Sequence, residues 1–399
     1  VQRRRPKLSV DTDGAPRDPR RRSIRKCANF TELYELGKTV MPSCHRDMEI
    51  RFATKLVKTG NSSRPPKEVV VKVRKKPGSF HSTKEEDAWR RNTELVMNLP
   101  ACAGIAKIED ALEDENGYYV VMEKVDGLDL HETLHNSGPM SLDDTKEVMR
   151  QLLEAVDALH TNGCIHKDLK LENVMIDRRA FRTPSPNGTV KLIDFDTVQD
   201  FGPGKPKATR VVGTDQYIAP EAYEGRYSPA SDVFAVGVIA YKLLTGSFPF
   251  KDETFDDEPG ENWVGSPKMQ EIRDRLKAHP VSFQRPRLMS LTQQERSGLT
   301  ALISRMMAAS ESDRPSAREA LADPWLAPVE RAASEGASPS PQARKPRKRA
   351  TLPAQVKDVS SWESASTSAS SSSANSPIAG RAAGTASAKA RAARKSFIP

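Results

Sequence analysis

Alternating apolar and polar residues mark the first third of the chain. Met48, Ile50 and Phe52 are separated by charged residues, and this period of two is typical of a strand with one buried face. Short apolar runs at 69–73 and 118–122 predict two further strands. The pattern therefore predicts a β-rich N-terminal part.

Elsewhere the apolar residues recur every three or four positions, which is the period of one helical face. This spacing predicts a helix over 85–99, packed on the sheet, and a long helix around Val148, Leu152 and Val156. Most later segments are helical as well. The run 233–244 has the size of a buried core helix and is too short to span a membrane. We therefore expect an α+β fold, β-rich first and then α-rich.

Composition separates this folded region from two flanks. Residues 1–29 are basic and rich in proline and aspartate, and residues 327–399 are rich in serine, alanine, proline and lysine. Neither flank has an apolar period, so we expect both to be disordered and the domain to span 30–326. Short insertions are predicted at 178–188 and 252–267.

The net charge of +9 lies mainly in the flanks, where arginine and lysine cluster at 3–5, 20–26 and 344–349. Basic tails do not form a binding groove, and no aromatic residues are interleaved with them, so no specific nucleic-acid partner is predicted. The last cluster fits a nuclear import signal or a solvated basic tail equally well.

The four cysteines are isolated and form neither a metal-binding spacing nor a disulfide framework. We therefore expect a reducing, intracellular location, cytoplasmic, nuclear or both. The chain opens with Val1 and shows no signal-peptide pattern, which is typical of a fragment whose true start is missing. The sequence gives no indication of the oligomeric state.

The candidate chemistry lies in three segments that follow one another. Residues 166–173 read His-Lys-Asp-Leu-Lys-Leu-Glu-Asn, which places a carboxylate, an ammonium and an amide on one loop after the long helix. The predicted strand 191–193 ends at Asp194, where a carboxylate is able to hold a metal. Residues 213–221 then read Gly-Thr-Asp-Gln-Tyr-Ile-Ala-Pro-Glu.

These segments closely resemble the catalytic loop, the D-F-G segment and the A-P-E segment of serine/threonine protein kinases. The resemblance covers 34–325 and is nearest to the calcium/calmodulin-dependent group. It implies a bilobal fold, with a small lobe over 30–122, a hinge over 123–127 and a larger, mainly helical lobe over 128–326. It also implies transfer of the γ-phosphate of ATP, with Mg²⁺, to protein substrates.

The resemblance assigns a role to each polar residue of these segments. Asp168 would accept the proton of the substrate hydroxyl, and Lys170 would neutralise the γ-phosphate. Thr214 would bond both of them, as in the serine/threonine branch. Asn173 and Asp194 would bind Mg²⁺.

The implied nucleotide site draws on both sides of the hinge. Lys72 would contact the α- and β-phosphates and pair with a helix carboxylate, for which Glu94 fits the family spacing best and Glu86 is the alternative. Met122 resembles the gatekeeper residue. The other implied nucleotide-site residues are Val40, Ile50, Glu123 and Val125.

Five further residues match supporting positions of the family. Asp232 resembles the anchor of the catalytic loop, and Glu221 with Arg314 resembles a buried ion pair. Asp129 and Glu172 occupy positions that, in basic-directed kinases, pair with arginine ahead of the acceptor. A basic-directed preference for serine or threonine is therefore expected.

Two departures concern the phosphates. No glycine follows Gly37 where the family has its glycine-rich loop, and we predict that His45 or Arg46 partly replaces the lost amide contacts. Asp196 stands where D-F-G has glycine, and its charge is suited either to recruit metal or to repel phosphate. These departures leave a second interpretation open, a pseudokinase that scaffolds partners with weak or no phosphotransfer.

A third departure concerns regulation. Lys167 replaces the arginine that often binds a phosphorylated activation loop in this family, and lysine lacks the bidentate fork of arginine. Thr209 is the candidate phosphosite, and a requirement for its phosphorylation does not follow from the sequence.

Overall fold

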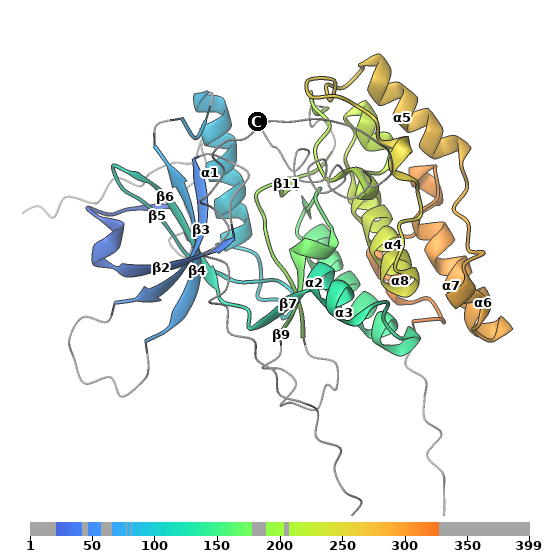
Figure 1. Cartoon of the computed structure of the whole chain (residues 1–399). Coiled ribbons are helices and arrows are strands. Elements are labelled where there is room, and N and C mark those ends of the chain that lie inside the picture. The colour runs from blue at the N-terminus through green and yellow to red at the C-terminus, as the bar shows by residue number, and fades with distance from the viewer. Residues whose placement is uncertain are drawn as a thin grey trace, which may run out of the picture. The chain divides into compact units, whose positions relative to one another are not determined.

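A six-stranded sheet and a group of helices account for most of the residues that the computed structural model describes, which are 21–41, 47–56, 66–76, 78–80, 82–177, 189–202 and 207–326 (Figure 1). The strand order is β1-β5-β6-β4-β3-β2, and every pairing is antiparallel except that of β1 with β5. The strands are β1 Arg25–Lys26, β2 Tyr34–Met41, β3 Met48–Lys55, β4 Glu68–Lys75, β5 Ile108–Glu113 and β6 Gly117–Glu123.

Three of these strands and the first long helix are where the periodicity predicted them. The alternating residues form β3, and the two apolar runs form β4 and β6. Helix α1, Thr83–Met97, begins after Ser82, whose side chain accepts a hydrogen bond from the Glu85 amide and so caps the helix. It buries Thr93, Val96 and Met97.

The N-terminal boundary of the domain lies earlier than composition predicted. Disorder was expected through residue 29, but β1 pairs with β5 in parallel, and the Cys27 amide donates to the Glu113 carbonyl at 2.9 Å. Hydrogen bonds to Glu94 of α1 and to Asn98, which follows it, hold the residues that precede β1 in place. Composition missed this segment because backbone pairing to a sheet edge needs no apolar side chains.

A small core fixes the residues that follow. Phe30 and Tyr34 are buried against Tyr119, with ring centroids 4.1 Å apart for Phe30 and Tyr119 and 5.0 Å apart for Phe30 and Tyr34. The buried acid Asp114 accepts hydrogen bonds from the Phe30 amide and the Tyr119 hydroxyl. The short helix η1, Phe30–Glu32, is thereby joined to the sheet.

Seven helices of the described part form the second region (Figure 1). They are α2 Leu130–Ser137, α3 Leu142–Thr161, α4 Pro229–Thr245, α5 Pro267–Ala278, α6 Pro286–Met289, α7 Gln293–Met306 and α8 Ala317–Leu321. Helix α3 packs against α4 and α8, and α4 packs against α7. Among the described helices, none is both long enough and apolar enough to cross a bilayer.

Helix α4 forms the centre of this region, as the apolar run 233–244 predicted. Its first turn carries a capping box between Ser228 and Ser231, and Pro229 occupies a starting position where no amide bond is lost. It ends at Gly246, whose φ of 74° suits glycine. Because the helix is buried on nearly all sides, its polar residues are held in fixed positions.

Short strands and turns connect the two regions and carry the segments with candidate chemistry. A three-stranded sheet contains β7 Gly127–Asp129, β9 Val174–Asp177 and β10 Thr189–Leu192, and β8 Cys164–Ile165 pairs with β11 Gln199–Asp200. Single helical turns are η2 Leu171–Asn173, η4 Asp215–Tyr217, η5 Pro220–Glu224, η6 Asp252–Thr254 and η7 Glu311–Asp313. One hydrophobic core runs from Val96 and Ile105 to α3 and α4, so the regions are packed together.

Two predicted segments, the insertion 178–188 and the flank 327–399, lie outside the described residues. The insertion 252–267 is described, and it pairs with the segment before the A-P-E motif through an isolated bridge between Arg210 and Trp263. The expected α+β bilobal architecture is confirmed.

Candidate active site

Three side chains of the predicted catalytic set form a hydrogen-bonded triangle. The Lys170 ammonium donates to Asp168 Oδ2 at 2.8 Å and to Thr214 Oγ1 at 3.1 Å, and the Thr214 hydroxyl donates to Asp168 Oδ1 at 2.8 Å. All three residues are buried. The Lys170 ammonium and the Thr214 hydroxyl therefore hold the two carboxylate oxygens of Asp168 in a fixed orientation.

Asn173 completes the loop from the turn η2. Its Nδ2 donates to the Asp168 carbonyl at 2.8 Å. Because the amide nitrogen is bonded to the backbone, Oδ1 is the atom of this side chain that is able to bind a cation. The four residues that the resemblance called catalytic are thus brought together.

Asp232 of α4 anchors the backbone of the catalytic loop. This carboxylate accepts the amides of His166 at 2.8 Å and Lys167 at 2.9 Å, and His160 Nε2 lies 2.9 Å from it. Burial opposes ionisation of Asp232, but these donors outweigh burial and hold its pKa below the ordinary value. The expected anchor is present.

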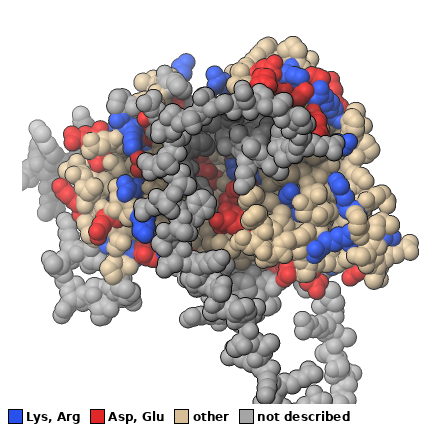
Figure 2. All heavy atoms as spheres, viewed as in Figure 1, with Lys and Arg blue, Asp and Glu red and all other residues tan. Residues whose placement is uncertain are grey.

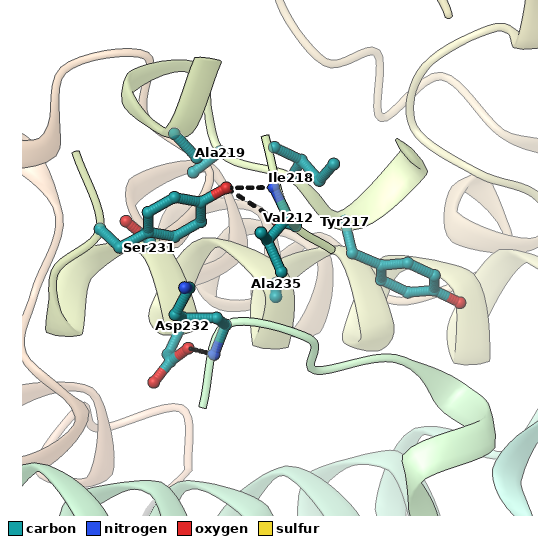
Figure 3. Close-up of a pocket in the computed structure, with 10 residues that line it drawn as sticks. Val212, Tyr217, Ile218, Ala219, Ser231, Asp232 and Ala235 are labelled. Carbon is teal, nitrogen blue, oxygen red and sulfur yellow. Dashed lines mark hydrogen bonds between the residues drawn. The ribbon is translucent and has the colours of Figure 1, made fainter. Parts of the chain in front are cut away.

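Asp232 also lines a small cavity between α4 and the segment around Tyr217 (Figure 3). Val212, Ile218 and Ala235 line its other sides, and its volume is about 10 Å³. This is room for about one water molecule. The cavity is therefore a packing feature behind the catalytic loop and is too small to hold a ligand.

Two non-glycine residues of the site have left-handed backbone conformations. Lys167 has φ 71° and Asp194 has φ 61°, and no other described non-glycine residue has a positive φ. Such conformations cost about 1–3 kcal/mol each and persist where the surroundings impose them. Both residues adjoin the predicted chemistry, which agrees with the tendency of strained turns to cluster at functional sites.

Lys72 of β4 lies buried between two carboxylates. Its Nζ is 2.7 Å from Asp194 Oδ1 and 2.7 Å from Asp196 Oδ2, and Arg74 Nη2 is 3.8 Å from the same Asp196 oxygen. Burial lowers the pKa of Lys72, but the two carboxylates outweigh burial and raise it. Burial raises the pKa of Asp194, and Lys72 with Lys170 lowers it by more. Lys72 and Asp194 are therefore both charged at neutral pH.

The predicted partner of Lys72 on helix α1 is not the one observed. Glu94 Oε1 accepts the Ile24 amide at 3.0 Å. The alternative, Glu86, accepts from Arg90 Nε at 2.9 Å and from the Tyr118 hydroxyl at 2.7 Å. The expectation of a Lys72–Glu94 pair is therefore wrong for this conformation, because the N-terminal segment occupies that carboxylate.

Three of the residues that the resemblance implied for the nucleotide site lie at or just after the end of β6. Met122 and Val125 are half-buried against the main core, and Glu123 Oε1 lies 2.7 Å from Lys191 Nζ. Ile50 is half-buried on β3, and Val40 is 38% exposed on β2. Their roles toward a nucleotide stay predictions. His45 and Arg46 lie outside the described residues.

The two acids predicted to recognise substrate interact with each other. Asp129 caps α2 by accepting the Glu132 amide at 2.7 Å, and β7, which it ends, packs on the turn η2 that carries Glu172. The pKa of Asp129 is raised, chiefly by burial and further by the charges of Glu132 and Glu172. Oε2 of Glu172 is buried without a hydrogen-bond partner. Acidic side chains are visible near the middle of the face in Figure 2.

The segment before the A-P-E motif is held by backbone pairing. The Val211 amide donates to the Asn262 carbonyl at 2.9 Å, and the Val264 amide donates to the Thr209 carbonyl at 3.0 Å. The side of this segment that faces the catalytic loop is fixed by Tyr227, whose hydroxyl accepts the Val212 amide at 2.6 Å and donates to its carbonyl at 2.9 Å.

Lys167 is engaged inside the protein. Its Nζ donates to Gln199 Oε1 at 3.0 Å and lies 4.6 Å from the centre of the Tyr227 ring. Burial lowers the pKa of Lys167 to about 8, and Asp232 opposes this shift. Sequence reasoning missed Tyr227 and Gln199, because neither belongs to a motif. The sequence singled out Asp196 but left open whether its charge recruits metal or repels phosphate.

The polar atoms near Asp194 suit a magnesium site. Mg²⁺ prefers oxygen ligands and is commonly held by one or two side chains together with phosphate oxygens. The Asp194 carboxylate and the Asn173 amide oxygen provide such ligands. Lys170 of the triangle also lowers the pKa of Asp194, although less than Lys72 does.

Comparison with known proteins agrees with this geometry. Residues 54–326 match the protein kinase domain family. The chain is 32% identical over 260 residues to a calcium/calmodulin-dependent serine/threonine-protein kinase 1 of Oryza sativa, covering 65% of this chain and 39% of that protein. It is 31% identical over 299 residues to CDPK-related kinase 5 of Arabidopsis thaliana, covering 75% of this chain and 45% of that protein.

The match begins at residue 54, so it leaves out β1, β2 and most of β3, the region in which no glycine follows Gly37. The chain spans less than half the length of these relatives. The family match covers more than half of the chain, and together with the triangle on the catalytic loop it shows that the chain belongs to the protein kinase domain family, similar to its calcium/calmodulin-dependent serine/threonine kinases.

Proposed function

We propose that this protein transfers the γ-phosphoryl group of ATP to serine or threonine hydroxyls of proteins, with a preference for basic sequences. The observation that carries the proposal is the triangle of Asp168, Lys170 and Thr214, with Lys72 and Asp194 on the other side of the site. Phosphoryl transfer depends mainly on positioning and on charge stabilisation, and these groups supply both.

Each residue of the triangle has a distinct part in the reaction. Asp168 orients the substrate hydroxyl and accepts its proton, because its two oxygens are already aimed by neighbouring donors. The Lys170 ammonium offsets negative charge on the transferred group. Thr214 holds both side chains in place. Mg²⁺ bound by Asp194 and Asn173 would neutralise phosphate charge.

Asp129 and Glu172 support the basic preference. An arginine side chain ahead of the acceptor would pair with two carboxylates that otherwise repel each other. A guanidinium beside these carboxylates would form charge-assisted hydrogen bonds with them. The expected substrates therefore carry arginine near the phosphorylated residue.

A pseudokinase is the second candidate, favoured by one observation. Lys72, the residue expected on the phosphates, is neutralised by two carboxylates. If neither carboxylate releases it, nucleotide binds weakly and the protein acts through its surface alone.

The deciding experiment incubates the full chain with Mg²⁺-ATP and an arrayed serine/threonine peptide library, beside Asp194→Ala and Asp168→Asn. Transfer by the wild-type chain that both variants lose supports the kinase. Transfer no greater than that of the variants supports the pseudokinase.

The basic preference has its own test. Glu172→Gln is expected to reduce kcat/KM for arginine-containing peptides by about ten-fold, with a smaller effect on peptides in which alanine replaces arginine. Equal losses on both peptides would remove the specificity claim and leave the phosphotransfer claim untouched.

A further inference from the structure

Asp196 contacts the lysine expected to hold the phosphates of ATP. Its Oδ2 lies 2.7 Å from Lys72 Nζ, as close as the Asp194 oxygen, and Asp196 is four-fifths buried. Arg74 approaches the same Asp196 oxygen at 3.8 Å. The Asp196 amide lies 3.4 Å from Asp194 Oδ1 and faces it. Asp196 is therefore part of the cluster around Lys72.

The two α1 carboxylates that the resemblance implied as partners of Lys72 are bonded elsewhere. Glu94 accepts a backbone amide from the N-terminal segment, and Glu86 accepts from Arg90 and Tyr118. The distances in the structure thus give Lys72 two carboxylate partners, and both come from the segment 194–196.

Asp194 and Asp196 cannot both remain partners of the Lys72 ammonium once a nucleotide binds with its metal. A cation at Asp194 would compete with Lys72 for that carboxylate. Asp196 would then be the anion left beside the buried ammonium, and a buried charge without a partner costs several kcal/mol. Arg74 balances part of the second carboxylate's charge, so both acids are tolerated before nucleotide binds.

We propose that Asp196 is the positioning residue of Lys72 and holds its ammonium toward the phosphates when Asp194 is engaged with metal. This inference rests on the proposed phosphotransfer. It has a clear consequence, because replacing Asp196 with glycine, the residue usual in the family, would impair this protein.

The kinetic test compares Asp196→Asn, Asp196→Gly and Asp196→Glu with wild type. The matched control is Asp200→Asn, which removes an exposed carboxylate four residues away. We expect Asp196→Asn and Asp196→Gly to lower kcat by about ten-fold or more with little change in peptide KM, as is typical of lost transition-state contacts. Asp196→Glu should recover part of the loss, and Asp200→Asn should stay near wild type.

A purely repulsive carboxylate predicts the opposite result. Asp196→Asn would then bind a fluorescent ATP analogue more tightly and transfer phosphate at least as fast as wild type, which overturns the proposal. Thermal melts of every variant verify that each one is folded, and Asp196→Glu keeps the test decisive if Asp196→Gly does not fold.

A structural arm separates this inference from the proposed function. Crystal structures of wild type with Mg²⁺ and a non-hydrolysable ATP analogue should show Lys72 Nζ within hydrogen-bonding distance of Asp196. Lys72 paired with Glu94 or Glu86 instead would refute the assignment, even if phosphotransfer is normal. Absence of phosphotransfer with the Lys72–Asp196 pair retained in the bound structure would refute the function and leave the positioning intact.

Discussion

The two sides of the candidate site differ in how closely they follow the kinase family. On the side of the catalytic loop, Asp168, Lys170, Thr214 and the anchor Asp232 all occupy the expected places. The phosphate side, around Lys72, departs from the family. No glycine follows Gly37 in the expected glycine-rich loop, the α1 carboxylate of Glu94 is bonded elsewhere, and Asp196 contacts Lys72.

The difference shows which part of the chemistry tolerates change. The proposed proton acceptance at Asp168 depends on a carboxylate whose two oxygens are both held by neighbouring donors. A lysine ammonium is a point charge with a flexible stem, so a carboxylate from another segment is able to replace its partner. We therefore expect the catalytic side to tolerate substitution less well than the phosphate side.

The largest expected effect is that of Asp168→Asn, which should impair the catalytic side and leave nucleotide binding on the phosphate side unchanged. Phosphotransfer should fall by about 10²–10⁴-fold because the proton acceptor is lost. Nucleotide affinity should stay near wild type, because the Lys72 cluster is left intact. Peptide kinetics and titration with a fluorescent ATP analogue measure the two quantities. A parallel loss of nucleotide affinity would contradict the separation.

The second prediction concerns the support of the catalytic side. Arg314 is fully buried and pairs with Glu221 through two hydrogen bonds, of 2.7 and 2.8 Å. Arg314→Met should lower the free energy of unfolding by about 3–5 kcal/mol, because Glu221 would remain buried without its partner. Urea denaturation measures the change.

Arg318→Met is the matched control for this prediction. Arg318 is 70% exposed and pairs with Asp157 at 2.9 Å, and such surface pairs contribute about 0–1 kcal/mol. Similar losses of unfolding free energy for both variants would show that the Arg314–Glu221 pair contributes no more to stability than a surface ion pair does.

The third prediction uses the one residue of the catalytic loop that departs from the family. Burial lowers the pKa of Lys167 to about 8 from an ordinary value of 10.5. Between these two values the unfolded chain binds the proton and the folded chain does not, so stability rises with pH in this window. Below the folded pKa, the cost of charging the buried amine is fully present.

Lys167→Met removes this titration. Relative to the variant, wild type should therefore gain stability as pH rises from about 8 to about 10.5, and the difference should be constant below that range. Urea denaturation of both proteins across the range checks this. A difference that does not change with pH would show that Lys167 is not shifted.

The smallest expected effect is that of Thr209→Ala. The segment around Thr209 is already held by backbone bonds to Asn262 and Val264, and Lys167 is engaged with Gln199. Activity should therefore stay within about two-fold of wild type. Peptide kinetics together with mass spectrometry of residue 209 test this, and a large loss accompanied by phosphate on Thr209 in wild type would restore the family's usual regulation.

Sequence reasoning reached most of the catalytic side because its residues stand at short, fixed spacings on one loop. Asp168, Lys170 and Asn173 are within six residues, so their meeting depends on local geometry alone. Strand and helix periods likewise placed β3, β4, β6, α1 and α4.

The phosphate side could not be predicted in the same way. Whether Glu94 or Glu86 faces Lys72 depends on how α1 is rotated and on what else competes for the carboxylate, and the competitor was the backbone of Ile24. The strand β1 was missed for a related reason, since its pairing uses main-chain atoms and leaves no apolar pattern. The use of Asp196 depends on contacts with Lys72 and Arg74, which lie more than a hundred residues away.

The pairing of β1 with β5 has a consequence for how the protein tolerates truncation. A chain cut at residue 30 would lose Arg25 and Lys26 from the sheet, together with the reciprocal hydrogen bonds between Arg22 and Asn98. The outer edge of β5 would then present unpaired amides and carbonyls, and such an edge recruits strands from other molecules. We therefore expect a chain that lacks residues 21–27 to aggregate more readily than the full chain.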